Sequence, residues 1–114
     1  MDEFTWSRSE KAAAKRAFDL AADRECRAIR REAQAMLEGA TDDQVVWRLH
    51  DYLSGKRREF GRKYDYRYSV LVRVFGRLIA EGWLTMDELS GLREEKLEAV
   101  RRLSSLGGDE REDV

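Results

Sequence analysis

The sequence predicts an all-helical protein, and three observations lead to that prediction. None of its 114 residues is proline, the residue that most strongly interrupts a helix. The chain is rich in alanine, leucine, glutamate, arginine and lysine, all of which are good helix formers. Its hydrophobic residues also recur at steps of three and four, the period of one helical face. A chain of this length forms one domain, so we expect residues 1–114 to be a single all-helical unit.

The first predicted helix runs from Ser7 to Glu38. Ser7 and Glu10 have the spacing of a capping box, and Gly39 is a natural stop. Residues 1–6 are expected to be a frayed end. At ~1.5 Å per residue this helix would be about 48 Å long, more than the ~30 Å typical of a small domain. Because its hydrophobic face is rich in alanine and a single chain has too little surface to cover it, we expect an antiparallel homodimer in which the long helices pack together.

The second predicted helix begins at another capping-box spacing, Thr41 with Gln44, and ends near Phe60, before Gly61. Residues 7–60 would therefore form a helical stalk. Hydrophobic residues on one face of this second helix are Val46, Leu49, Leu53 and Phe60.

Residues 62–105 are expected to form a smaller head of two helices. Asp65 is the candidate cap of the first, and Gly82 its stop. Thr85 opens a third capping-box spacing, at which the second head helix would start. Residues 107–114, which begin with a glycine pair and are strongly acidic, are expected to be a disordered tail.

A neighbouring face of the helix predicted over 41–60 combines one large aromatic residue with charged and hydrogen-bonding groups. Its members are Trp47, His50, Asp51, Ser54, Arg57 and Arg58. A tryptophan on a helix is often part of a core, but these polar neighbours favour an interface, where tryptophan is enriched. Asp51 and Arg57 are six residues apart and pair poorly within one helix, so a strong ion pair between them would have to join two chains.

The charge is unevenly distributed along the chain. Between Lys56 and Arg77 there are eight basic residues and two acidic ones, a net charge of +6 in a chain whose total is −1. Such a block attracts an acidic protein partner or a nucleic acid. The near-neutral total and the acidic tail weigh against nucleic acid. A separate group of arginines in the first helix is expected to be solvated: Arg24, Arg27, Arg30 and Arg31.

Several chemistries are excluded. His50 is the only histidine and Cys26 the only cysteine, so the sequence offers no metal site, no disulfide and no catalytic triad, and we expect neither enzymatic activity nor a cofactor. His50 and Asp51 are adjacent and would point about 100° apart on a helix. Cys26 is expected to be a small core residue. With no membrane-spanning run and no signal-peptide pattern, we expect a soluble cytoplasmic protein.

Three consecutive motifs carry a family resemblance. They are W-x-LHD-x-L-S-x-KR, then KYD-x-R-x-SV, then F-x-x-L-x-x-EG with EL-x-x-L, all between Trp47 and Leu92. This segment resembles the fluorescence recovery protein family of photoprotection regulators. The N-terminal helix matches that family only in length and helical character.

The resemblance implies a small all-helical dimer without enzymatic activity. It implies binding to light-activated orange carotenoid protein, mainly at the C-terminal domain of that protein, or to a related protein. It also implies faster return of that partner to its resting orange form, which ends energy quenching at the phycobilisome. The resemblance also links four residues present here to the dimer interface and to activity: Trp47, His50, Asp51 and Arg57.

The candidate partner-binding surface lies in the basic block, where a third helix can bury one face and turn its arginines outward. Its residues are Tyr64, Arg67, Arg73 and Arg77. Arg73 stands where the resemblance leads us to expect an apolar or aromatic residue. Two alternatives to the photoprotective role follow from this region: a dimeric helical adaptor with another protein partner, and a basic nucleic-acid-binding module.

Overall fold

The computed structural model describes residues 4–112 of the chain, with side chains described for residues 4–106. Over this part the protein contains helices and no strand, which confirms the predicted all-helical fold class with four α-helices. The elements are α1 (Arg8–Gly39), α2 (Val45–Lys63), α3 (Leu71–Glu81), the short 3-10 helix η1 (Met86–Leu89) and α4 (Glu94–Glu112).

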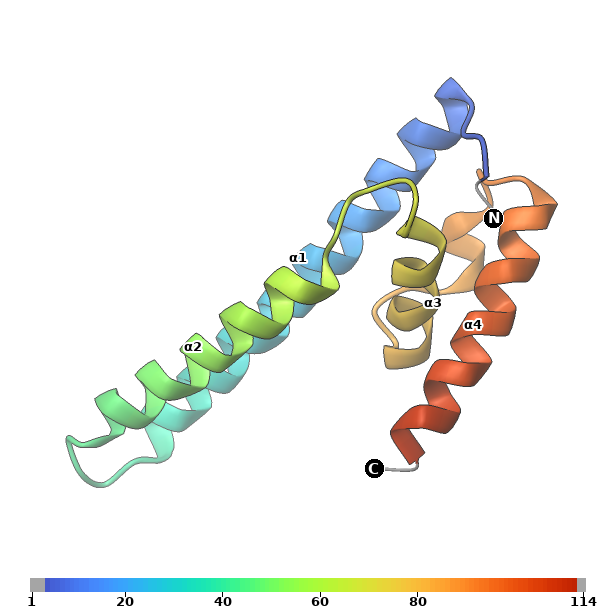
Figure 1. Cartoon of the computed structure of the whole chain (residues 1–114). Helices are drawn as coiled ribbons and strands as arrows, with labels where there is room; N and C mark the ends of the chain where they lie inside the picture. The colour runs from blue at the N-terminus through green and yellow to red at the C-terminus, as the bar shows by residue number, and fades with distance from the viewer. Residues whose placement is uncertain (1–3, 113–114) are drawn as a thin grey trace.

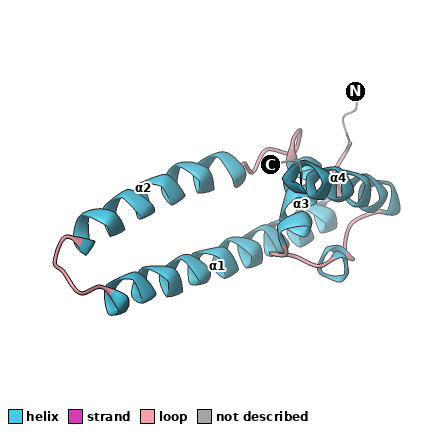
Figure 2. Ribbon diagram, turned by 90° about the horizontal axis from the view of Figure 1, so that it is seen from below, coloured by secondary structure: helices cyan, strands magenta, loops and turns pink. Residues whose placement is uncertain are grey.

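The helices form a long antiparallel hairpin with a smaller helical group at one end (Figures 1 and 2). The stalk consists of α1 and α2, and the head consists of α3, η1 and α4 beside the N-terminal half of α1. The molecule measures 53 × 32 × 23 Å along its principal axes. This elongation follows from α1, because its 32 residues rise about 48 Å at ~1.5 Å each.

The hydrophobic core lies in the head. Small residues of α1 pack there against α3, η1 and α4, and the fully buried members include Ala14, Ala21, Leu71, Phe75, Leu78 and Val100. Alanines suit this position because they let the neighbouring helices approach α1 closely. The far part of the stalk has no comparable core, since Val45 is the only buried hydrophobic residue of α2.

The start of α1 agrees with the capping-box prediction. The Ser7 hydroxyl accepts a hydrogen bond from the Glu10 backbone N–H at 3.2 Å, and Glu10 Oε1 accepts one from the Ser7 backbone N–H at 3.0 Å. The expectation of a frayed end does not hold for Trp6, which packs against the core with its ring 5.5 Å from that of Tyr68. Residues 1–3 of that expected end lie outside the described part of the chain.

The predicted start and end of α2 are both wrong. Gln44 is the N-cap and makes no capping hydrogen bond through its side chain; its backbone N–H donates to Asp42 Oδ1 at 2.8 Å instead. The helix also continues through Gly61 to Lys63. Lys63 is buried in ion pairs with the rest of the molecule, and this tertiary anchoring outweighs the weak helix propensity of a single glycine.

The loop between α2 and α3 is longer than the sequence indicated. Asp65 does not cap α3, which begins at Leu71, because its carboxylate binds the Arg67 guanidinium at distances from 2.6 to 3.1 Å. The predicted stop at Gly82 is confirmed, with a left-handed φ of 88° that a residue with a side chain rarely adopts.

The last predicted helix is divided in two. Glu88 accepts a hydrogen bond from the Thr85 backbone N–H at 3.0 Å, but this cap starts only the short helix η1. The long helix α4 begins later, at Glu94, and passes through the glycine pair at 107–108 to Glu112. The backbone is thus helical beyond the glycine pair, where the sequence predicts the end of the last helix, and residues 113–114 lie outside the described part.

Candidate protein-interaction site

The outward surface of α2 exposes large hydrophobic side chains. Trp47 is 64% exposed, Val46 49% and Leu53 40%. The predicted hydrophobic face of this helix is thus divided, because Leu49 and Phe60 are half-buried while Val46 and Leu53 are exposed. On the other stalk helix, Leu37 is exposed as well. Neighbouring exposed hydrophobic residues of this size are typical of a surface that another molecule covers.

We define the outer stalk face by the exposed residues of α2 on this surface: Val46, Trp47, His50, Asp51, Leu53 and Arg57. The structure brings only two of its polar members together. His50 Nδ1 lies 3.3 Å from Asp51 Oδ1, so the ends of these two exposed side chains meet although adjacent residues leave the helix about 100° apart. Arg57 is exposed and forms no ion pair or hydrogen bond within the described part of the chain.

The candidate partner-binding residues fall into two groups. Arg67, Arg73 and Arg77 are exposed, and the last two lie on the outer side of α3, as expected. Arg77 Nε donates to Glu81 Oε2 at 2.7 Å. The Arg67 guanidinium, through its hydrogen bonds, keeps the pKa of Asp65 below its usual value.

Tyr64 is half-buried at the junction between stalk and head. Its hydroxyl donates to Glu25 Oε1 at 2.8 Å, and its ring stacks on Phe60 with centroids 4.3 Å apart. Burial, together with the hydrogen bond to Glu25 and the negative charge of that residue, raises the pKa of the Tyr64 hydroxyl. Tyr64 therefore supports the position of the neighbouring loop, whereas the three arginines are exposed on the surface, two of them in ion pairs with Asp65 and Glu81.

A buried ionic cluster joins the stalk to the head, and the sequence reasoning missed it. Lys63 of α2 donates to Glu25 of α1 at 2.8 Å and to Glu81 of α3 at 2.5 Å. The indole N–H of Trp83 donates to the same Glu81 oxygen at 3.1 Å. The helical period could have identified Glu25 as a buried residue. It lies four residues after the buried Ala21, which itself lies four residues after the buried Ala17.

Two further ion pairs fix the head against α1. Arg24 was expected to be solvated, but its guanidinium binds both carboxylate oxygens of Glu88 at 2.7 and 2.8 Å and also donates to the Trp83 carbonyl at 3.0 Å. These hydrogen bonds from Arg24, with one from the Thr85 backbone, lower the pKa of Glu88 to about 2.

The second pair is buried. Lys96 of α4 donates to both oxygens of Glu10, at 3.2 and 3.0 Å, and Glu10 Oε2 also accepts the Arg93 backbone N–H at 2.9 Å. Burial raises the pKa of Glu10, but the hydrogen bonds from Ser7, Arg93 and Lys96 outweigh it and lower the pKa to about 2. Both ion pairs give the head one fixed orientation on α1.

Other expectations can be checked in the described part of the chain. Cys26 is exposed, so its prediction as a core residue is wrong. Among residues 4–112 no group of three or more metal-ligating side chains comes together. A search of the same residues finds no helix with the length and hydrophobicity required to cross a membrane.

The fold and its surfaces define a class of small all-helical proteins in which a long helical hairpin carries a compact head. The chain belongs to the fluorescence recovery protein family: the family described as "Photoprotection regulator fluorescence recovery protein" matches residues 6–104. This assignment makes it a member of a family of photoprotection regulators, and it confirms the resemblance noted in the sequence.

Individual relatives agree with this assignment. The fluorescence recovery protein of Synechocystis sp. (strain ATCC 27184 / PCC 6803 / Kazusa) is 36% identical over 104 residues, which are 91% of this chain and 95% of the relative. The structure of the Fremyella diplosiphon fluorescence recovery protein is similar with a TM-score of 0.82 and 44% identity, covering 89% of this chain and 99% of that one. The Synechocystis sp. PCC 6803 structure has the same TM-score and coverage at 36% identity.

Proposed function

We propose that this protein is a non-enzymatic regulator that binds light-activated orange carotenoid protein, or a related carotenoid-binding protein, and accelerates its return to the resting state in the cytoplasm. The observation that carries the proposal is the outer stalk face, in which the four residues expected from the family resemblance are all exposed on α2. A regulator without a cofactor acts on a partner only by binding its states with different affinities.

The outer stalk face is proposed as the dimer interface. Its Val46, Trp47 and Leu53 are all exposed on α2, and a second antiparallel copy would remove these hydrophobic surfaces from water. Arg57 is without an ion-pair partner in the described part of the chain, and Asp51 contacts only His50. Pairing of Asp51 with Arg57 of a second copy would satisfy both charges in an antiparallel arrangement.

The partner-binding surface is proposed on the head, around Arg67, Arg73 and Arg77. These cations project from α3 and the loop before it, and α3 itself is held firmly because its opposite side forms the core. An acidic surface on the C-terminal domain of the partner would complement them and make association sensitive to salt. A rigid head on a dimeric stalk would present two such surfaces.

Nucleic-acid binding is the less supported alternative. Four of the eight cations between Lys56 and Arg77 already contact carboxylates: Lys56, Lys63, Arg67 and Arg77. Their partners neutralise part of the positive block that would attract a polyanion. The same neutralisation applies to Arg67 and Arg77 of the proposed partner-binding surface, so the preference for a protein partner rests on membership of the family of photoprotection regulators.

Co-elution from a size-exclusion column tests the proposed binding. The protein should co-elute with illuminated orange carotenoid protein and much less with the dark-adapted form, because the regulator must distinguish the two states. Equal co-elution with both forms, or with neither, would contradict the proposed function. A double-stranded DNA of mixed sequence run in parallel tests the alternative.

A further inference from the structure

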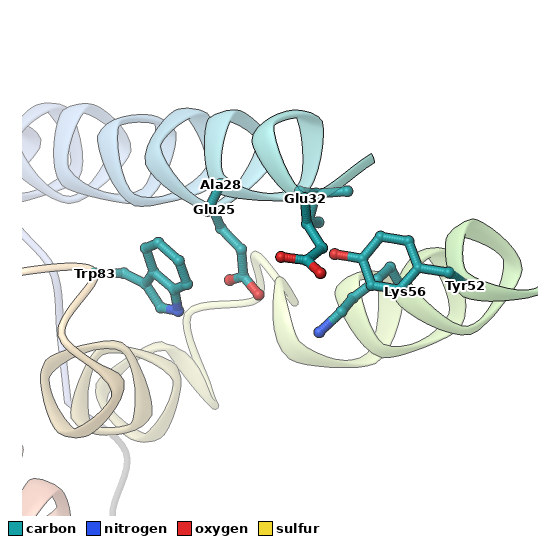
Figure 3. A pocket seen from close by; sticks show the side chains of 7 residues that line it. Glu25, Ala28, Glu32, Tyr52, Lys56 and Trp83 are labelled. Carbon is teal, nitrogen blue, oxygen red and sulfur yellow. The ribbon is translucent and has the colours of Figure 1, made fainter. Parts of the chain in front are cut away.

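A pocket lies in the corner where the stalk meets the head, on a different side from the outer stalk face. Its volume is about 330 Å³. The lining residues come from α1, α2 and the turn after α3, and they are Glu25, Ala28, Ile29, Glu32, Tyr52, Lys56 and Trp83. Figure 3 shows the carboxylates of Glu25 and Glu32 between the rings of Trp83 and Tyr52. The pocket thus combines aromatic walls with negative charge.

The aromatic wall at Trp83 is held in place from two sides. Its indole N–H donates to Glu81 at 3.1 Å, and its backbone carbonyl accepts a hydrogen bond from Arg24 at 3.0 Å. Tyr52 forms the opposite wall and has the Lys56 ammonium 5.8 Å from its ring centroid. Faces of tryptophan and tyrosine attract cations, most strongly where water is partly excluded.

The charges lining the pocket do not balance. Glu25 is neutralised by Lys63, which is buried with it. Lys56 ion-pairs with Glu59 at 3.7 Å. Glu32 forms no hydrogen bond or ion pair within residues 4–106, so the pocket lining carries two carboxylates, Glu25 and Glu32, against the one ammonium of Lys56.

We propose that this pocket binds the guanidinium group of an arginine side chain on a protein partner other than a second copy of this chain. A guanidinium is flat and weakly hydrated, stacks on aromatic rings and binds a carboxylate through two parallel N–H groups, which matches Trp83, Tyr52 and Glu32 better than an ammonium would. The volume is at the lower end of the ~300–1,000 Å³ range of small-molecule sites, which suits a single side chain.

The position of the pocket indicates that the arginine comes from another partner and not from a second copy of this chain. Tyr52 and Lys56 are four residues apart on the side of α2 that faces α1, whereas Trp47 and Leu53 are exposed on the outer stalk face. A second copy covering the outer stalk face would leave this corner open. The inference therefore requires neither the dimer nor the proposed photoprotective partner.

Nuclear magnetic resonance on the ¹⁵N-labelled full chain tests the site with Nα-acetyl-arginine amide as the probe. We expect saturable shifts of the Trp83 indole N–H and of the backbone amides of residues 28–32, with an affinity in the millimolar range (about 1–10 mM, as for one weak ion pair with ring stacking). The matched control is Nα-acetyl-citrulline amide, which has nearly the same shape and no charge. It should bind at least about fivefold more weakly.

Three variants locate the binding. Glu32→Gln should weaken arginine binding about two- to fivefold, the value of one exposed charge pair. Glu38→Gln, which removes an exposed carboxylate of α1 outside the pocket, should leave the affinity unchanged. Lys56→Gln should leave it unchanged or increase it, because it removes a competing cation from the pocket wall.

Equal shifts with arginine and citrulline would overturn the proposal. So would shifts spread over all acidic surfaces, or an equal effect of Glu32→Gln and Glu38→Gln. An arginine affinity that falls as the protein concentration rises would show that a second copy occupies the pocket, and would overturn the assignment to a different partner.

Discussion

Lys96 and Glu10 are both buried, and the Lys96 ammonium donates to the two oxygens of the Glu10 carboxylate at 3.2 and 3.0 Å. The residues are 86 positions apart, so this ion pair ties the first turn of α1 to α4. The ring of Trp6 lies 4.9 Å from the same ammonium and covers the pair from the N-terminal side. The orientation of the head on the stalk depends on such contacts, since few hydrophobic residues of α1 are large.

Glu10→Gln should destabilise the protein by about 3–5 kcal/mol, because it leaves the buried Lys96 ammonium without a counter-charge. Urea denaturation followed by circular dichroism measures the free energy of unfolding. The control is Glu98→Gln, which removes an exposed carboxylate from α4, the helix that carries Lys96. It should change stability by less than about 0.5 kcal/mol. Similar losses in the two variants would contradict the role assigned to the buried pair.

Stability should also fall in acid because of Glu88. Its pKa is about 2 in the folded protein and close to 4.5 when unfolded, so its ion pair with Arg24 contributes fully above pH 4.5 and is lost as the pH falls toward 2. The difference in unfolding free energy between the wild type and Glu88→Gln should therefore be constant from pH 5 to 7 and shrink below about pH 4.5. A difference that stays constant down to pH 2.5 would contradict this assignment.

Gly76 is required by the close packing of α3 on α4. A Cβ atom at this position would lie 2.8 Å from Leu103 Cβ, so Gly76→Ala should cost about 1–3 kcal/mol through overpacking. Gly55 in α2 is the matched control, because a Cβ there meets nothing within 4 Å. Gly55→Ala should stabilise the helix by about 0.5–1 kcal/mol. Thermal unfolding of both variants measures the two effects, and a stabilised Gly76→Ala would refute the packing argument.

The proposed antiparallel dimer predicts that charges at Asp51 and Arg57 act across the interface. Asp51→Arg or Arg57→Asp alone should raise the monomer fraction at micromolar concentration, because each places like charges together. The double variant restores opposite charges and should recover most of the dimer. Sedimentation equilibrium measures the dissociation constants. No recovery in the double variant would show that these two residues do not pair between chains.

Local signals in the sequence were sufficient for several features of the fold. Ser7 and Glu10 interact within one helical turn, so their spacing alone predicts the start of α1. Gly82 ends α3 because its own backbone conformation requires glycine. Trp47 was correctly separated from the core by the polar residues at neighbouring helical steps.

Several of the errors share a physical cause, which is pairing between residues far apart in the chain. Arg24 binds Glu88 at a separation of 64 residues, and Lys63 binds Glu25 at a separation of 38, and neither partner can be identified from local periodicity. The pair at Lys63 also extends α2 beyond Gly61, where propensity predicted an end. The pocket between the stalk and the head was missed for the same reason, since its walls come from three separate segments.

The rate at which illuminated orange carotenoid protein returns from red to orange in the dark tests the central claim most directly. We expect acceleration with substoichiometric amounts of this protein, because a regulator that binds the partner transiently is released and used again. Arg73→Phe should change the accelerated rate while leaving the dimer intact, since Arg73 is exposed on α3 in the head, whereas the outer stalk face lies on α2. A recovery rate unchanged at every ratio of the two proteins would contradict the proposed photoprotective function.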